Sequence, residues 1–165
     1  MSDIAESLEL RPLAEEDAEE LRRIHREPAV SRWWDEPDPD FPWDEPESPR
    51  LTVLVDGAVA GLVQYWEEPE PKYRHAGIDL FLDPAVHGRD VGRTVVWLVA
   101  SDLVRRLGHH RLVIDPAADN VAAIRCYAAV GFRPVGVMRQ YERGPDGSWH
   151  DGLLMDLLAD ELRQP

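Results

Sequence analysis

Residues 77 to 94 read GIDLFLDPAVHGRDVGRT. The pattern is an apolar strand followed by a short loop with Gly88 and Gly92. The residues that follow have apolar side chains at every fourth position, at Val95, Val99 and Leu103, which is typical of a helix. Backbone N–H groups at such a loop and at a helix N-terminus can bind phosphate, and Arg89 and Arg93 add positive charge there. The stretch therefore predicts an anion site, although glycines also mark ordinary turns between a strand and a helix.

Around this stretch, the chain alternates between strand and helix patterns. We expect strands at residues 8–13, 51–55, 58–66, 75–82, 111–115, 133–141 and 149–158, and helices at 14–27, 92–107 and 120–132. Asp56-Gly57 is a hairpin signal, and Asn120 and Gly131 are suited to cap the last helix. The order β-α-β-β-β-α-β-α-β-β predicts an α/β fold with a mixed sheet, in a single domain spanning residues 1–165.

Negative charge is concentrated in one short part of the sequence. The net charge is −14, and residues 35–47, the acidic segment, hold 7 of the 32 acids and no lysine or arginine. This balance argues against a nucleic-acid partner, whose phosphates need basic side chains, and favours a cationic one. The alternative is that the acids only keep the protein soluble.

The other compositional signals fit a cytoplasmic location. No apolar stretch approaches the roughly 18 residues that a membrane helix needs, and MSDIAESLELRP does not resemble a signal peptide. The single cysteine, Cys126, excludes an internal disulfide and fits a reducing compartment. No set of His, Cys and carboxylate residues has ligand spacing, so we expect no metal site.

The stretch WWDEPDPDFPW, residues 33–43, combines aromatic and acidic side chains. Its prolines predict irregular backbone, and we expect an acidic, proline-rich insertion at about residues 33–50. Tryptophan faces attract nearby cations, which carboxylates pair. Trp33, Trp34 and Asp35, with Trp43, could thus form a platform for a cationic ligand. The competing interpretation is a mobile acidic lid.

A second motif, DPAADNVAAIRCYAAVGF at residues 115–132, completes a recognisable pair. Together with the loop above, it resembles the GNAT family of N-acetyltransferases, and the order of elements extends the resemblance to nearly the whole chain. The matching positions of this motif are Asn120, Ala123, Tyr127, Gly131 and Phe132. The resemblance implies the GNAT fold, acetyl-CoA as co-substrate, and direct transfer of the acetyl group within a ternary complex.

The resemblance also implies a position for the coenzyme. Its pyrophosphate is expected on the loop and its pantetheine arm along the preceding strand; the expected contacts are Phe81, Leu82, His87, Gly88, Arg89, Asp90, Val91, Gly92, Arg93, Thr94 and Asn120. The loop departs from the family pattern, because His87 stands where Arg or Gln is usual and Asp90 where a glycine is usual. Asp tolerates a left-handed backbone, but its charge should weaken coenzyme binding unless Arg89 or Arg93 offsets it.

Within the family, the sequence is most similar to the aminoglycoside 6′-N-acetyltransferases. Gly77-Ile78-Asp79 resembles the strand that carries their general base. The positions that resemble their substrate contacts are Trp33, Trp34, Asp35, Gln64, Asp115 and Asp151. The implied acceptor is a cationic, aminoglycoside-like amino sugar, and the implied role is antibiotic resistance.

Acetyl transfer to an amine needs both a base and a proton donor. An amine with a pKa near ~10.4 is neutral in only about 1 of 10³ molecules at pH 7, a penalty of roughly 4 kcal/mol, so a base is needed. Asp79 fits, because strand alternation places it opposite Ile78 and Leu80; the alternative is a solvated strand carboxylate. The departing thiolate needs a proton, and the resemblance assigns that role to Tyr127, which could otherwise be a core tyrosine.

Two other functions are compatible with the sequence. An acidic cleft could recognise a basic terminus, as in a protein or peptide N-acetyltransferase. The substitution at Asp90 is the only indication of a non-catalytic acyl-CoA-binding module, and the presence of both Asp79 and Tyr127 favours an enzyme over it. The sequence does not decide between a monomer and a homodimer.

Overall fold

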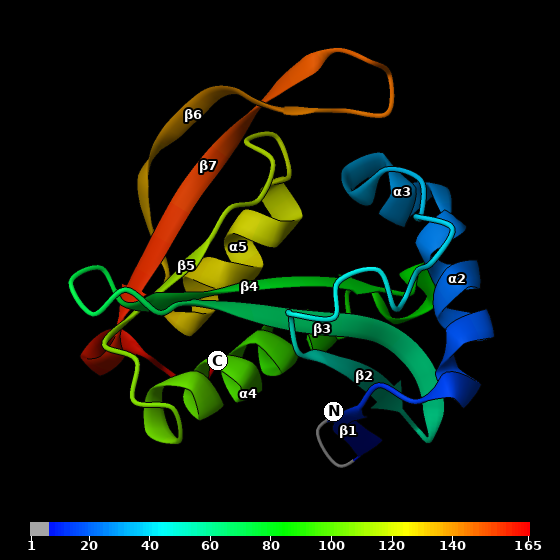
Figure 1. Ribbon diagram of the computed structural model, residues 1–165, viewed down its shortest axis with the longest axis horizontal. Coiled ribbons are helices and arrows are strands. Elements are labelled where there is room, and N and C mark those ends of the chain that lie inside the picture. The colour runs from blue at the N-terminus through cyan, green and yellow to red at the C-terminus, as the bar shows by residue number, and fades with distance from the viewer. Residues whose placement is uncertain (1–6) are drawn as a thin grey trace. The chain divides into compact units, whose positions relative to one another are not determined.

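The computed structural model describes residues 7–165 and contains seven strands and four α-helices within them (Figure 1). The strands are β1 (Leu8–Pro12), β2 (Arg50–Val55), β3 (Ala58–Glu68), β4 (His75–Leu82), β5 (Arg111–Ile114), β6 (Arg133–Arg143) and β7 (Trp149–Leu158). The α-helices are α2 (Ala18–Arg26), α3 (Pro28–Trp34), α4 (Val91–Arg105) and α5 (Val121–Val130). Short 3-10 helices are η1 (Glu15–Asp17), η2 (Pro84–Val86) and η3 (Ala159–Glu161).

The strands form one mixed sheet in the order β1-β2-β3-β4-β5-β7-β6. β4 and β5 are parallel, with Ala76 opposite Leu112, whereas β1·β2, β2·β3, β5·β7 and β6·β7 are antiparallel. The prediction of an α/β fold with a mixed sheet is confirmed. None of the helices within residues 7–165 is long and apolar enough to cross a membrane.

The fold comprises two compact units. Unit 1 contains the described residues up to Tyr65 together with Asp79–Val95, and unit 2 contains Trp66–Ile78 and Val96–Pro165. β3, β4 and α4 contribute residues to both units.

The core of unit 1 forms around α2. Leu21 and Ile24 lie three positions apart on one face of this helix and are fully buried, while Glu19 and Glu20 occupy its first turn, where the helix dipole favours negative charge. The residues that form one buried cluster are Leu21, Ile24, Val30, Phe41, Leu62 and Phe81. Because Phe41 belongs to this cluster, the acidic segment is anchored to the core at its centre.

A second anchor in unit 1 is the buried carboxylate of Asp17. Both of its oxygens accept hydrogen bonds from the Arg11 guanidinium at 2.7 Å, and one also accepts from the Thr52 hydroxyl at 2.7 Å. The hydrogen bonds from Arg11, with support from Thr52, lower the pKa of Asp17 below its ordinary value. This network ties η1 to strands β1 and β2.

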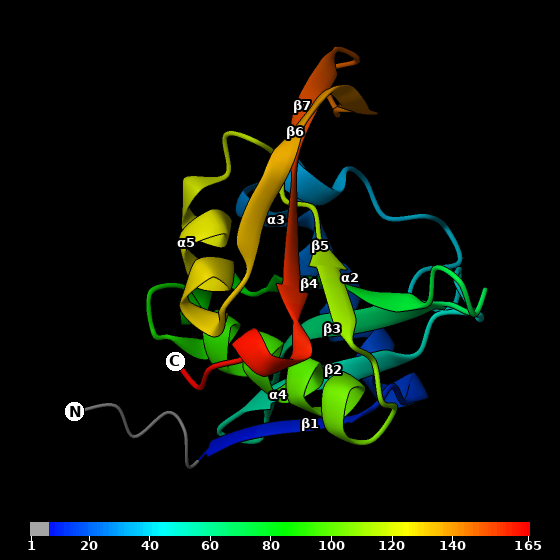
Figure 2. The ribbon, with the colours of Figure 1, turned by 90° about the vertical axis from the view of Figure 1, so that its left-hand side faces the viewer.

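The core of unit 2 includes buried residues of β5, β7 and α5. Leu112, Met155 and Leu157 are fully buried, and Val130 of α5 is buried as well. The Asn120 side chain caps α5 by accepting from the backbone N–H of Ala123 at 3.2 Å, as the sequence predicts. Figure 2 shows that β6 and β7 continue as a long two-stranded ribbon.

The sequence prediction of irregular backbone from residue 33 onward is wrong at its start. Trp33 and Trp34 belong to α3, which begins at Pro28, a position where proline is well tolerated because no helical N–H is needed there. Glu27, which precedes this proline, has ψ 133° and separates α2 from α3. The helix ends at Trp34. The next residue, Asp35, has φ 65°, and regular structure resumes only at β2.

Candidate functional site

The loop that precedes α4 has an unusual backbone. Gly88 has φ 75° and Asp90 has φ 61°, so both take the left-handed conformation, which Asp adopts more readily than most residues. A side-chain carbon at Gly88 would meet nothing within 4 Å, which leaves the loop open. Residues 87–90 are exposed, and α4 begins directly after them.

The charges of this loop are paired within unit 1. Arg93 donates through Nε to Asp90 Oδ1 at 3.0 Å, and Arg89 lies 3.9 Å from Asp56. The Thr94 hydroxyl donates to the Asp90 carbonyl at 3.0 Å, which closes the first turn of α4. Arg93 thus offsets the Asp90 carboxylate, and both arginines remain exposed enough to exchange their partners for a phosphate.

His87, the other departure from the family pattern, anchors the loop. Its Nε2 lies 2.9 Å from the Leu82 carbonyl at the end of β4. Because a carbonyl can only accept, Nε2 carries the proton in this contact. The open backbone, the helix N-terminus and the two arginines together fit a pyrophosphate group.

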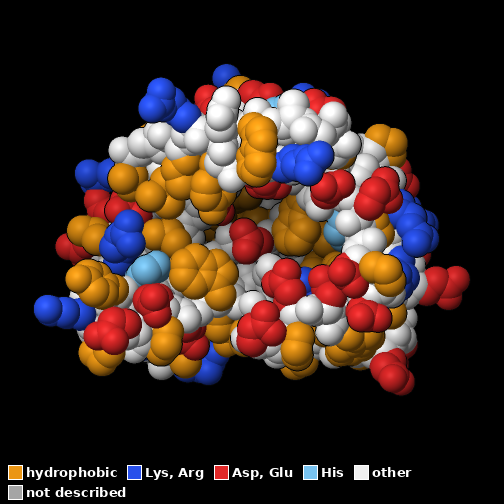
Figure 3. Space-filling view, turned by 45° about the horizontal axis from the view of Figure 1, so that its top comes forward, with side chains coloured by type: hydrophobic (Ala, Val, Ile, Leu, Met, Phe, Trp, Pro, Cys, Tyr) orange, Lys and Arg blue, Asp and Glu red, His pale blue; other side chains and the backbone are white. Residues whose placement is uncertain are grey.

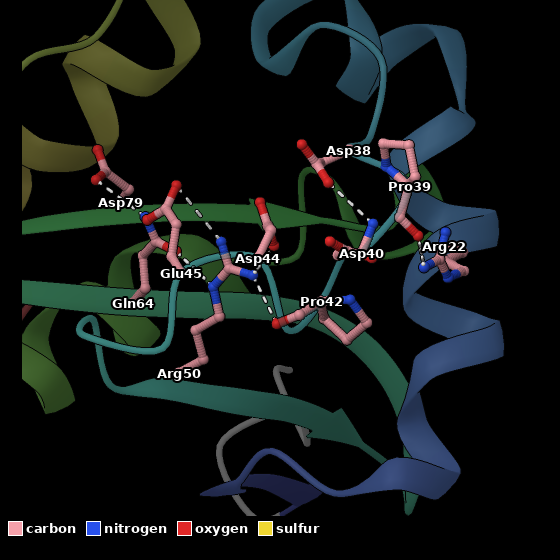
Figure 4. Close-up of polar contacts among 10 residues, drawn as sticks. All are labelled: Arg22, Asp38, Pro39, Asp40, Pro42, Asp44, Glu45, Arg50, Gln64 and Asp79. Atoms are coloured by element: carbon pink, nitrogen blue, oxygen red, sulfur yellow. Dashed lines mark hydrogen bonds and ion pairs between the residues drawn. The ribbon is translucent and has the colours of Figure 1, made fainter.

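A buried arginine organises the acidic segment (Figure 4). Arg50, at the start of β2, donates to the Pro42 carbonyl at 2.7 Å and to Asp44 Oδ1 at 2.6 Å, and its Nη2 lies 3.7 Å from Glu45. Its side chain is only 4% exposed, so these partners compensate the cost of removing the charge from water. This role of Arg50 was not predicted from the sequence, although a single arginine that opens the apolar strand RLTVLV is a signal for it.

The same arginine contacts Gln64, and Gln64 leads to Asp79. Arg50 Nε donates to Gln64 Oε1 at 2.8 Å. The Gln64 amide nitrogen lies 3.3 Å from Glu45 Oε2 and 3.5 Å from Asp79 Oδ2. The structure therefore brings together two of the predicted site residues, Gln64 and Asp79, and adds Glu45 to them.

The two tryptophans of α3 have different surroundings. Trp34 donates through its indole N–H to the Leu80 carbonyl at 3.1 Å, and its ring packs edge-on against Phe81 at 5.1 Å between centroids. Trp34 therefore stabilises unit 1, whether or not its remaining face also contacts a ligand. Trp33 is half-buried, and the guanidinium of Arg32 lies 4.4 Å from its ring centroid. Asp35 is exposed.

The residues of β4 that are predicted to contact the coenzyme are mostly buried. Phe81 and Leu82 are 5% and 9% exposed, so their side chains offer a ligand little surface. Asp79, on the same strand, is half-buried.

The remaining predicted residues lie in unit 2, where Asp115 faces a cavity of about 220 Å³. Trp66, His75, Arg111, Met138 and Tyr141 also line this cavity. Burial raises the pKa of Asp115 above its ordinary value, and a hydrogen bond with Tyr141 partly opposes that change. A carboxylate in such surroundings gains from a nearby cation, and the Trp66 ring provides an aromatic wall.

Three other unit 2 residues have identifiable structural contacts. Tyr127 is 9% exposed and packs edge-on against Phe132 at 6.4 Å. The amide oxygen of Asn120 is engaged in the cap of α5. Asp151 Oδ1 accepts from the backbone N–H of Gln140 at 2.8 Å, and Asp151 is otherwise exposed. Among residues 7–165, no group of three or more His, Cys, Asp or Glu side chains is placed to hold a metal ion.

A family model described as "Acetyltransferase (GNAT) family" matches residues 18–132. The chain belongs to the GNAT family. It is therefore an N-acetyltransferase of the GNAT type, with acetyl-CoA as co-substrate. No relative was found among curated protein sequences.

Solved structures agree with this GNAT assignment at the level of the fold. Spermidine N-acetyltransferase from Vibrio cholerae, in complex with CoA and spermine, has a TM-score of 0.81 and 20% identity over 94% of this chain and 98% of its own. Ribosomal-protein-S5-alanine acetyltransferase from Vibrio fischeri has a TM-score of 0.79 and 16% identity over 96% of both chains. An aminoglycoside acetyltransferase in complex with coenzyme A and kanamycin has a TM-score of 0.74 and 22% identity over 94% of this chain and 96% of its own.

These GNAT structures differ in the acceptor that each one names. A polyamine, a ribosomal protein and an aminoglycoside are all represented at similar identity. Identities this low show only a shared fold. The predicted relationship to the aminoglycoside 6′-N-acetyltransferases therefore remains a proposal.

Proposed function

We propose that the acceptor of this GNAT enzyme is a cationic, aminoglycoside-like amino sugar, and that the enzyme acts in the cytoplasm as an antibiotic-resistance acetyltransferase. The observation that carries this proposal is the placement of Glu45 and Asp79 on the same Gln64 amide, with Asp44 beside them on Arg50. Figure 3 shows several acidic side chains close together on the face in view. Several carboxylates are better matched by an acceptor that carries several positive charges than by one that carries a single ammonium group.

The acceptor needs more than negative charge. A sugar presents C–H faces as well as ammonium groups, and aromatic rings pack on such faces and attract cations. Trp66 in unit 2 lines the cavity that Asp115 faces, and in unit 1 the half-buried Trp33 precedes Asp35 by two residues in the sequence. An aromatic ring and a carboxylate around one cavity, as in unit 2, suit an amino sugar better than a linear polyamine.

The proposed reaction is direct transfer. The acceptor nitrogen forms a bond to the acetyl carbon, and the bond between that carbon and sulfur breaks. Asp79 takes the proton from the acceptor ammonium, since only the neutral amine is nucleophilic. A backbone N–H of residues 80–82 donates to the carbonyl oxygen as negative charge develops on it. Tyr127 donates its hydroxyl proton to the leaving thiolate, the role that the family motif implies, and its oxygen regains a proton when the nitrogen loses its second proton to form the amide.

The proposed contacts to acetyl-CoA, the acetyl donor, follow from the geometry of the loop before α4. The residues proposed to hold the pyrophosphate are His87, Gly88, Arg89, Asp90, Val91, Gly92, Arg93 and Thr94. Backbone N–H groups at the start of α4 supply the hydrogen bonds, and Arg93 supplies charge once it exchanges Asp90 for phosphate.

A panel assay separates this function from its rivals. Release of free thiol from acetyl-CoA is measured with aminoglycosides, linear polyamines and basic peptides, and the products are identified by mass spectrometry. We expect the highest kcat/KM with an aminoglycoside and a product that carries one acetyl group. Preference for a peptide would make the enzyme a protein or peptide N-acetyltransferase. Binding of acetyl-CoA without turnover on any acceptor would make it a binding module.

A further inference from the structure

The Gln64 side chain has one orientation that satisfies all its neighbours. Arg50 Nε can only donate, so the oxygen of the amide must face it, as it does at 2.8 Å. Glu45 and Asp79, as carboxylates, can only accept, so the NH2 group must face them. Gln64 is 6% exposed, so water has little access to take the place of these partners.

Arg50 is itself held in a fixed position. Its Nη1 bonds the Pro42 carbonyl and Asp44, its Nε bonds Gln64, and its guanidinium lies 5.4 Å from the centroid of the buried Phe41 ring. With three partners around a planar fork, the guanidinium has little freedom to rotate. The amide that it orients is therefore fixed as well.

We infer that Arg50 is a positioning residue for acetyl transfer: through the Gln64 amide it holds the carboxylate of Asp79, and it draws Glu45 to the same amide. This inference rests on the proposed function of Asp79 as the base. The contacts from the Gln64 nitrogen, 3.3 and 3.5 Å, are long for hydrogen bonds, so the amide guides both carboxylates without binding either one tightly. A base held in this way is oriented but remains able to take a proton.

Lysine cannot replace arginine in this arrangement. Its ammonium would keep the charge near Asp44, but it has no Nε–H at the position that faces Gln64. The amide would then lose the donor that fixes its orientation and could rotate. Arg50→Lys therefore separates the effect of charge from the effect of orientation.

The chain offers a matched control. Arg22 of α2 also donates to a proline carbonyl of the acidic segment, that of Pro39, at 2.6 Å (Figure 4). Arg22→Lys makes the same chemical change and also loosens the acidic segment, without touching Gln64. Gln64→Met is the second test variant, because it removes the amide and leaves Arg50 in place.

One arm of the experiment does not depend on any acceptor. The side-chain amide signals of Gln64 are recorded in a ¹⁵N–¹H NMR spectrum and assigned by their loss in Gln64→Met. We expect these signals to shift in Arg50→Lys and in Asp79→Asn but to stay in place in Arg22→Lys. Unmoved Gln64 signals in Arg50→Lys would overturn the inference, even if the enzyme acetylates none of the acceptors tested.

The second arm measures turnover with the best acceptor at saturating acetyl-CoA. We expect Arg50→Lys and Gln64→Met each to lower kcat by roughly 10- to 100-fold, the scale of a misplaced catalytic group, with KM changed by less than about threefold. The double variant should be no slower than the slower single one, because both changes break the same path. Additive losses, a change confined to KM, or an equal loss in Arg22→Lys would contradict the positioning role. Absence of turnover in the unmodified enzyme would instead reject the proposed function, and the NMR arm alone would decide the inference.

Discussion

Arg93 donates through Nε to the Asp90 carboxylate across 3.0 Å, within the first turn of α4. Asp90 stands where the family pattern has glycine, and its φ of 61° is one that glycine adopts without strain. The ion pair is exposed, so water and salt weaken it, and a phosphate group can compete for the arginine. The backbone therefore accommodates aspartate at position 90, and Arg93 compensates its negative charge.

Asp90→Gly should leave the affinity for acetyl-CoA equal or improved. The change removes a negative charge near the proposed pyrophosphate and frees Arg93, and it relieves a left-handed backbone at a non-glycine residue. Isothermal titration calorimetry with acetyl-CoA measures the effect. A clear loss of affinity would mean that Asp90 has a positive role, such as holding Arg93 in the orientation that the coenzyme needs.

Gly92→Asp tests the placement of the pyrophosphate itself. The new side chain adds bulk and negative charge to the start of α4, so the dissociation constant for acetyl-CoA should rise well beyond tenfold, which is about 1.4 kcal/mol. Gly136→Asp is the control, because it adds the same charge on β6, where a side-chain carbon meets nothing within 4 Å. Equal affinities for the two variants would reject the proposed coenzyme site.

Asp17 makes the free energy of unfolding depend on pH. Its pKa is lowered in the folded state by hydrogen bonds from Arg11, so its contribution is fully present above the pKa of the unfolded chain, near ~3.9, and is lost as pH falls through the lower folded value. Asp17→Asn should therefore cost about 2 kcal/mol at pH 7, and the cost should shrink as pH falls from about 5 toward 2.

Chemical denaturation at several pH values measures this difference. Glu16→Gln is the matched control, because Glu16 lies 3.9 Å from the same arginine but is 79% exposed, so its removal should cost little at any pH. A cost for Asp17→Asn that stays constant across the pH range would mean that the ion pair with Arg11 does not contribute.

Local signals in the sequence were sufficient for most of the fold. The bounds of β4 are those predicted, and the turn at Asp56-Gly57 has the two positive φ values, 53° and 79°, that such a hairpin requires. Asn120 and Gly131 flank α5 as expected. Helix α3 was missed, because a proline next to a helix indicates an end and only the tertiary packing of Trp34 and Val30 shows that a second helix begins there.

Less of the site than of the fold could be predicted from the sequence. Gln64 and Asp79 could be proposed one by one from the resemblance, but the link between them depends on an amide orientation that Arg50 sets from 14 residues away. The role of Glu45 depends on the path of an irregular segment, which has no periodic pattern to predict it. The contacts of Trp34 with Leu80 and Phe81 likewise join elements that are distant in the sequence.

We expect Asp79 to remove the proton from the acceptor amine, and a pH–rate series on two variants distinguishes this role from substrate binding. With one aminoglycoside at saturation, Asp79→Asn should lower kcat by roughly 10² to 10⁴, and the loss should shrink as pH rises, because more of the amine is then already neutral. Asp115→Asn, which removes the carboxylate that faces the unit 2 cavity, should act mainly on KM. Wild-type turnover in Asp79→Asn, together with lost turnover in Asp115→Asn, would contradict the account and exchange the two roles.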